Sequence, residues 1–137
     1  MGDVRALFTR YGERYMAADA EAVADMCEAP FLAVRGGKPI HLPDRAALVE
    51  HFGGVMAAYR QSGAQAAEIV NIDVLEQGDS AVLATLRWNV RSAGGDLIRE
   101  LWTSYQLVGP SPWRIVSYVN HDAVRPAGDT TATQESR

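Results

Sequence analysis

The 137-residue sequence is poor in the residues that build covalent crosslinks and metal sites. Its one cysteine, Cys27, has no second cysteine with which to form an intrachain disulfide. Its three histidines, His41, His51 and His121, are far apart, and no His-x3-His or Glu-x-x-His pair is present. The sequence therefore predicts no metal site.

Basic clusters and long apolar runs are also missing. Lys and Arg number 13 against 17 Asp and Glu, giving a net charge of −4 without any basic stripe, which disfavours nucleic-acid binding through phosphate neutralisation. No apolar run approaches the roughly 18 residues of a membrane span, and the first ten residues lack the apolar core of a signal peptide. We therefore expect a cytoplasmic protein that binds neither nucleic acid nor membrane.

Glycine-rich phosphate loops are absent too. Gly36-Gly37-Lys38 lacks the first glycine of a P-loop and the Ser or Thr after its lysine, and no G-x-G-x-x-G occurs. The sequence thus predicts no nucleotide cofactor, and no cofactor of another kind is indicated.

What is present fits one globular domain, because 47% of the residues are hydrophobic and the length suits a single core. We expect this domain to span residues 1–122. The remainder, 123–137, is polar and rich in small residues, which favours a flexible C-terminal tail.

The first half of the chain has the three-to-four-residue spacing of amphipathic helices. One stripe runs from Val4 to Tyr15, and Asp19 can cap a second helix that stops before Pro30. A short hairpin over 31–42 follows, and Asp44 can cap a third helix reaching Tyr59.

The second half alternates with a period of two, which predicts long strands over 68–75, 81–92, 97–108 and 113–121. In this alternation Trp88 and Tyr105 share a face with other apolar residues, so we expect them inside. Ser117 and His121 lie an even number of residues after Ile115, so a regular strand places them on the same inward face. Helices followed by strands joined through tight turns indicate an α+β protein with an antiparallel meander.

The opposite sheet face combines aromatic and polar residues. Trp102 and Tyr118 are expected there, which favours a homodimer interface through the outer sheet face. The alternative is an ordinary scatter of apolar surface residues.

These features resemble the NTF2-like superfamily, the cone-shaped α+β fold of ketosteroid isomerases and SnoaL-like polyketide cyclases. The resemblance rests on Tyr11, on the helix entry over 18–23, on Leu42-Pro43-Asp44 and on Trp113-Arg114-Ile115. It covers roughly residues 4–122. It implies a curved sheet closed by three N-terminal helices around one pocket, often in a dimer packed sheet to sheet.

The resemblance also implies where catalytic groups would lie. Tyr11 matches the tyrosine that donates to the developing oxyanion in ketosteroid isomerases, whereas the position of their carboxylate base falls near Val34, where no carboxylate occurs. Steroid isomerase chemistry is therefore not expected. His121 remains as an acid/base candidate because an imidazole titrates near neutrality; the alternative is a strand-end histidine in solvent.

Several further residues are candidates for ligand contact. Tyr15, Trp88 and Tyr105 offer an aromatic wall, Ser117 a hydroxyl, and Arg35 a cation for an acidic ligand group at the pocket mouth. Core packing explains the aromatics equally well, and Arg35 can equally be a solvated charge beside a turn.

The sequence thus supports two hypotheses of different class. The first is a protein that binds a small, largely apolar molecule and acts on it by cofactor-free isomerase, cyclase or dehydratase chemistry, with His121 and Tyr11 as catalytic residues. The second is a non-catalytic ligand-binding or protein-interaction module on the same fold.

Overall fold

The computed structural model describes residues 2–121; Met1, Asp122 and the tail expected over 123–137 lie outside the described residues. The elements follow one another in this order: α1 Gly2–Met16, α2 Ala20–Asp25, β1 Cys27–Arg35, β2 Lys38–Leu42, α3 Arg45–Gln61, β3 Ala64–Glu76, β4 Ala81–Ser92, β5 Leu97–Val108 and β6 Arg114–His121. The predicted α+β class, with three N-terminal helices, is confirmed.

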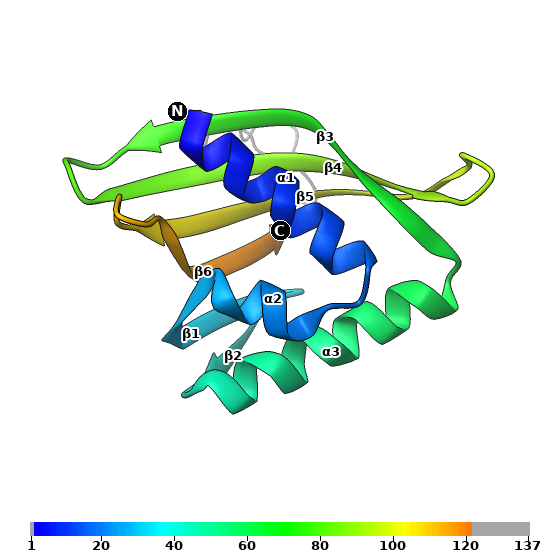
Figure 1. Ribbon diagram of the computed structural model, residues 1–137, viewed down its shortest axis with the longest axis horizontal. Helices are drawn as coiled ribbons and strands as arrows, with labels where there is room; N and C mark the ends of the chain where they lie inside the picture. Colours follow the sequence, from blue (N-terminus) through cyan, green and yellow to red (C-terminus); the bar gives the residue numbers. More distant parts are fainter. Residues whose placement is uncertain (1, 122–137) are drawn as a thin grey trace, which may run out of the picture.

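The six strands form one curved sheet in the order β2-β1-β6-β5-β4-β3 (Figure 1). The long strands β3 to β6 pair as an antiparallel meander, as the tight turns between them predict. β1 pairs with β6 in parallel, so the sheet is mixed. This pair joins the N-terminal hairpin to the meander, and α1 to α3 lie on one side of the resulting surface.

Side-chain caps begin two of the helices at the predicted residues. Asp19 accepts a hydrogen bond from the backbone N–H of Ala22 at 3.1 Å, and Asp44 accepts one from Ala47 at 2.9 Å. α2 ends at Asp25, earlier than the stop expected from Pro30. Pro30 instead lies in β1, where the register with β6 shifts between Cys27 and Leu32, so its missing N–H interrupts no regular ladder.

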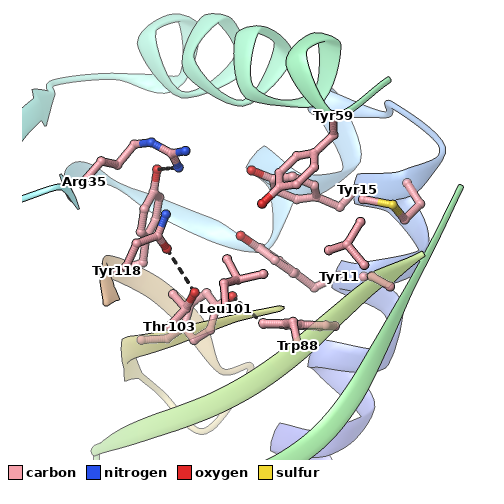
Figure 2. A pocket seen from close by; sticks show the side chains of 14 residues that line it. Tyr11, Tyr15, Arg35, Tyr59, Trp88, Leu101, Thr103 and Tyr118 are labelled. Atoms are coloured by element: carbon pink, nitrogen blue, oxygen red, sulfur yellow. Dashed lines mark hydrogen bonds between the residues drawn. The ribbon is translucent and has the colours of Figure 1, made fainter. Parts of the chain in front are cut away.

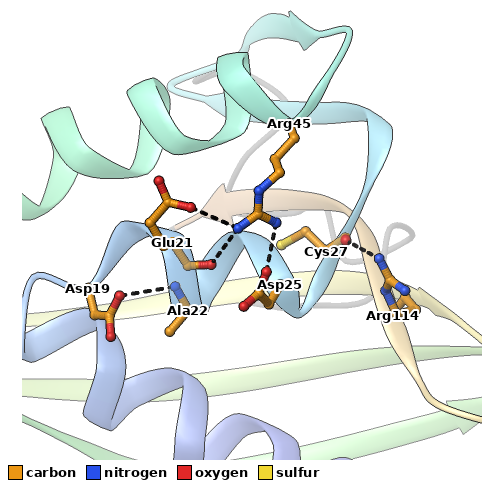
Figure 3. A network of polar contacts seen from close by, with 7 residues as sticks. All are labelled: Asp19, Glu21, Ala22, Asp25, Cys27, Arg45 and Arg114. Carbon is orange, nitrogen blue, oxygen red and sulfur yellow. Dashed lines mark hydrogen bonds and ion pairs between the residues drawn. The ribbon is translucent and has the colours of Figure 1, made fainter.

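Polar contacts join α2 to α3 and β1 to β6 (Figure 3). Arg45 forms ion pairs with Glu21 at 2.9 Å and Asp25 at 2.7 Å, and Arg114 donates to the backbone carbonyl of Cys27 at 2.8 Å. Burial raises the pKa of Cys27 to about 12, so this cysteine stays a thiol.

The apolar core fills the concave side of the sheet under the helices. Phe8, Phe52 and Leu86 are fully buried there. α1 approaches β4 closely at Gly12, where a Cβ atom would lie 2.9 Å from Cζ3 of Trp88. Gly12 therefore allows this helix to rest directly on the indole ring.

A β-bulge in β6 changes which of its side chains face the core. Leu107 pairs with Ile115 but Gln106 pairs with Ser117, so Val116 is the extra residue. Ile115 before the bulge and Tyr118 after it are both buried. After the bulge, the side chains of Tyr118 and Asn120 therefore face inward. The expectation that Ser117 and His121 face inward is wrong.

The helices over residues 2–121 include none with the length and apolar character to cross a membrane. The cytoplasmic location stays a prediction.

Candidate functional site

The cone encloses a narrow cavity between α1 and the concave face of the sheet. Its volume is about 50 Å³, which is room for a few water molecules. Six of its lining residues are aromatic, and Figure 2 shows Tyr11, Tyr15 and Trp88 among them. The lining residues are Tyr11, Gly12, Tyr15, Met16, Arg35, Tyr59, Ala67, Trp88, Val90, Leu101, Thr103, Tyr105, Tyr118 and Asn120.

The inner end of this cavity is aromatic. Trp88 Nε1 donates to the Tyr105 hydroxyl at 3.1 Å, and the ring centroid of Tyr11 lies 5.6 Å from that of Tyr105 in an edge-on arrangement. Burial raises the pKa of Tyr11 and of Tyr105 well above the usual tyrosine range. Both hydroxyls therefore stay protonated and can donate hydrogen bonds.

The outer end is polar and centres on Tyr118. Arg35 Nη1 donates to the Tyr118 hydroxyl at 3.1 Å, and His51 Nε2 lies 2.6 Å from the same oxygen. β1, β6 and α3 supply these three side chains, so tertiary packing alone brings them together. We refer to Arg35, His51 and Tyr118 as the mouth cluster.

The mouth cluster changes how its members ionise. Burial, and then the positive charge of Arg35, lower the pKa of His51, which favours the neutral imidazole. Burial raises the pKa of Tyr118, and the hydrogen bond from Arg35 lowers it by a smaller amount, so the phenol stays protonated. The cluster thus holds a neutral base and a protonated phenol in direct contact.

A wider groove continues outward from the cavity. Its volume of about 610 Å³ lies within the roughly 300–1,000 Å³ of typical small-molecule sites. Arg35 and Tyr59 line both spaces, so they mark the passage between them. The groove is lined by Arg35, Ile40, His51, Gly54, Val55, Ala58, Tyr59, Ser62, Ile98 and Arg99.

Five of the residues named from the sequence meet at the cavity: Tyr11, Tyr15, Arg35, Trp88 and Tyr105. Their contact with a ligand stays a prediction.

Three other placements need correction. His121 lies on the outer face, where its Nε2 is 3.0 Å from the Ser104 hydroxyl, and Ser117 pairs there with Gln106. Tyr118, expected on the outer face, is 3% exposed and lines the cavity. The bulge at Val116 explains all three errors, because it reverses the facing of every later residue in β6. Trp102 faces outward, as expected from the alternation, and lies under the Arg87 guanidinium at 5.9 Å.

Sequence reasoning missed several polar residues of the site, among them His51, Tyr59 and Asn120. His51 lies beside the apolar stripe of its helix, so the sequence pattern does not direct it toward the core. Its position three residues after the buried Leu48 was a usable signal, since that spacing places it at the edge of the packed face. Asn120 had no such signal, because its facing depends on the bulge.

Among residues 2–121, no group of three His, Cys, Asp or Glu side chains is placed to hold a metal ion. The lining of the cavity and groove contains no carboxylate within that range. The chemistry available there is consequently that of hydroxyl, imidazole and guanidinium groups.

Comparison with known proteins identifies relatives by family and by fold. The family model described as NTF2-like protein (DUF6841) matches residues 2–123. No curated protein matches the chain.

Solved structures extend the likeness in fold. An NTF2-like protein with a cystatin-like fold from Novosphingobium aromaticivorans is 23% identical, with a TM-score of 0.71 over 93% of this chain and 84% of the other. Aln2 from a Streptomyces species is 23% identical, with a TM-score of 0.68 over 88% of each chain. A Catenulispora acidiphila protein, solved in complex with S-DNPA, is 18% identical, with a TM-score of 0.67 over 87% of this chain and 90% of the other.

Proposed function

Because the chain belongs to the NTF2-like proteins of the DUF6841 family, we propose that it binds a small, largely apolar molecule inside its cone. The observation that carries this proposal is the aromatic cavity that opens through Arg35 and Tyr59 into a groove of ligand size. The inner cavity is too small for a whole organic ligand. Such a molecule therefore lies in the groove and inserts one edge between the aromatic side chains.

A relative of the same fold supports this reading in outline, because the Catenulispora acidiphila protein is seen in complex with a small molecule, S-DNPA. That protein is 18% identical to this chain, so it supports small-molecule binding as a property of the fold and says nothing of the ligand here.

A matched pair of variants on β3 tests the proposal. Ala67 lines the cavity, whereas its neighbour Ala66 is exposed on the other side of the strand. Ala67→Phe fills the cavity and should abolish binding of 2-naphthamide, a flat neutral probe, in isothermal titration calorimetry; Ala66→Phe should bind like the unchanged protein. Unfolding temperatures of both variants check that the fold survives. Failure of the unchanged protein to bind both 2-naphthamide and its anionic analogue 2-naphthoate would contradict the proposal.

A second candidate function, acid/base chemistry, is favoured by the 2.6 Å contact between His51 and Tyr118. The ligand gives a proton to the Tyr118 oxygen while Tyr118 passes its own proton to His51 Nε2. The ligand becomes an anion, His51 becomes an imidazolium, and Tyr118 stays neutral. Arg35 stabilises the new negative charge. Proton removal of this kind begins isomerisation, cyclisation and dehydration reactions.

Proton exchange separates this enzyme hypothesis from the non-catalytic alternative. In D2O, the unchanged protein should accelerate deuterium incorporation into the acidic methyl group of 2-acetonaphthone, measured by NMR. His51→Gln and Tyr118→Phe should lose this acceleration, whereas His121→Gln on the outer face should keep it. Binding without any acceleration would favour the non-catalytic module.

Dimerisation through the outer sheet face is a separate proposal. Trp102 faces outward, and Leu32 and Val119 on the adjoining strands are 41% and 39% exposed. The partner we propose is a second copy of the chain. Analytical ultracentrifugation should detect a dimer for the unchanged protein and a folded monomer for Trp102→Glu; a dimer unaffected by this change would rule out the assigned face.

A further inference from the structure

Arg35 holds a positive charge inside the molecule without an acidic partner among residues 2–121. Three other arginines, unlike Arg35, form ion pairs, and they do so near solvent. These pairs are Arg45 with Glu21 and Asp25, Arg87 with Glu100, and Arg91 with Glu68. Arg35 is half-buried, and its one hydrogen bond to a described residue goes to the Tyr118 hydroxyl. A partly desolvated guanidinium with unused donors is unfavourable unless an acceptor reaches it.

The surroundings of Arg35 reinforce this imbalance. Arg99 also lines the groove, and no carboxylate among the described residues lines either space. The chain as a whole carries a net charge of −4, so this cationic lining runs against the overall charge. Clefts with one sign of charge concentrate ligands of the opposite sign.

Hydroxyl donors converge on the same space. Figure 2 shows the hydroxyl ends of Tyr11, Tyr15 and Tyr59 directed toward the side of the cavity where Arg35 and Tyr118 lie. Within residues 2–121, no side-chain hydrogen bond uses the Tyr15 or Tyr59 hydroxyl. Burial raises the pKa of Tyr15, so its hydroxyl stays protonated and can donate. Protonated phenols beside a guanidinium form a set of donors for one anionic acceptor.

We propose that the ligand of this cavity is a small aromatic acid, whose carboxylate binds Arg35 and the neighbouring tyrosine hydroxyls while its ring lies among the aromatic side chains. This inference rests on the proposed binding function and adds the charge and class of the ligand. A guanidinium can bind a carboxylate through two parallel hydrogen bonds, which fixes the direction in which the ring enters.

An isosteric pair of probes tests the charge directly. 2-Naphthoate and 2-naphthamide have the same ring and nearly the same shape, but only the first is anionic. By calorimetry, the unchanged protein should bind 2-naphthoate about tenfold to a hundredfold more tightly, the range expected from charge-assisted hydrogen bonds. Arg35→Met should remove this preference by weakening the binding of 2-naphthoate far more than that of 2-naphthamide. Arg99→Met, an exposed position on the groove, is the matched control and should keep most of the preference.

The outcomes separate this inference from the proposal beneath it. Equal affinity of the unchanged protein for the two probes overturns the aromatic-acid ligand while small-molecule binding stands. Persistence of the preference in Arg35→Met, with the unfolding temperature preserved, also overturns it. Failure to bind either probe overturns both proposals.

Discussion

The two faces of the sheet treat charge in opposite ways. On the outer face, Arg87 pairs with Glu100 and stacks on Trp102, so its charge is neutralised locally and remains near water. On the inner face, Arg35 donates to the Tyr118 hydroxyl and meets no carboxylate of the described chain. The outer cation is paired within the described chain, whereas the inner one is left for the carboxylate ligand that we propose.

The same contrast holds for the two part-buried histidines. His121 contacts the Ser104 hydroxyl on the outer face, and His51 contacts the Tyr118 phenol at the mouth of the cavity. Both pairs join an imidazole to a hydroxyl group. Their position relative to the cavity, and the cation beside His51, set them apart. A histidine–hydroxyl contact therefore indicates a site only when its surroundings provide a place for a ligand.

The largest expected difference between the faces is in packing. Leu86 is fully buried on the inner face of β4, whereas its neighbour Thr85 points outward and bonds to Ser104. Leu86→Ala should lower the free energy of unfolding by about 2–5 kcal/mol because it leaves a cavity. Thr85→Ala should cost about 1 kcal/mol, the contribution of one partly exposed hydrogen bond. Urea denaturation measures both, and similar losses would contradict the assigned faces.

A smaller effect concerns the contact between α1 and the sheet. Gly12→Ala places a Cβ atom against Trp88, and such overpacking costs about 1–3 kcal/mol. Gly54→Ala in α3 meets nothing within 4 Å, so it should stabilise the protein by up to about 1 kcal/mol through helix propensity. Relative to the unchanged protein, the unfolding temperature should fall for Gly12→Ala and rise for Gly54→Ala. A stabilising effect of Gly12→Ala would mean that α1 does not rest on the indole.

The mouth cluster should also make stability depend on pH. Because the pKa of His51 is lowered in the folded protein, the unfolded chain binds this proton more readily. His51 therefore favours folding fully above its ordinary pKa of about 6.5 and loses that contribution as the pH falls from there toward its lowered value. His51→Gln should flatten this part of the stability profile. In NMR titrations, Arg35→Met should raise the pKa of His51; an unchanged value would show that Arg35 does not act on the imidazole.

The smallest effect is expected on the outer face at His121, which pairs across the strands with Trp102. His121→Gln should change the free energy of unfolding by about 0.5 kcal/mol or less, the usual range for surface substitutions, and leave 2-naphthamide affinity within about twofold. Calorimetry with this variant sharpens the comparison with His51. A large loss of affinity would indicate that the outer face contributes to ligand binding.

Much of the fold could be read from local patterns. The helix caps Asp19 and Asp44 stand where their side chains were expected to accept hydrogen bonds, because capping involves residues only three positions apart. The alternation along β4 placed Trp88 and Leu86 inside correctly, since β4 keeps its alternation unbroken through these positions.

The site was less accessible because it depends on contacts between distant segments. Tyr11, Tyr15 and Arg35 could be named as candidates from their spacing and from family resemblance. His51 and Asn120 could not, since their relation to the cavity depends on how α3 and β6 pack against the other elements.

The sequence by itself determined the α+β class, the starts of α2 and α3 and the apolar inner face of β4, because each follows from the pattern of a single segment. Only the tertiary structure decided the facing of β6 after Val116, and with it the exchange of Tyr118 for His121 at the cavity. The physical reason is that a β-bulge is a property of two paired strands. One extra residue reverses every later side chain, and no pattern within β6 alone records it.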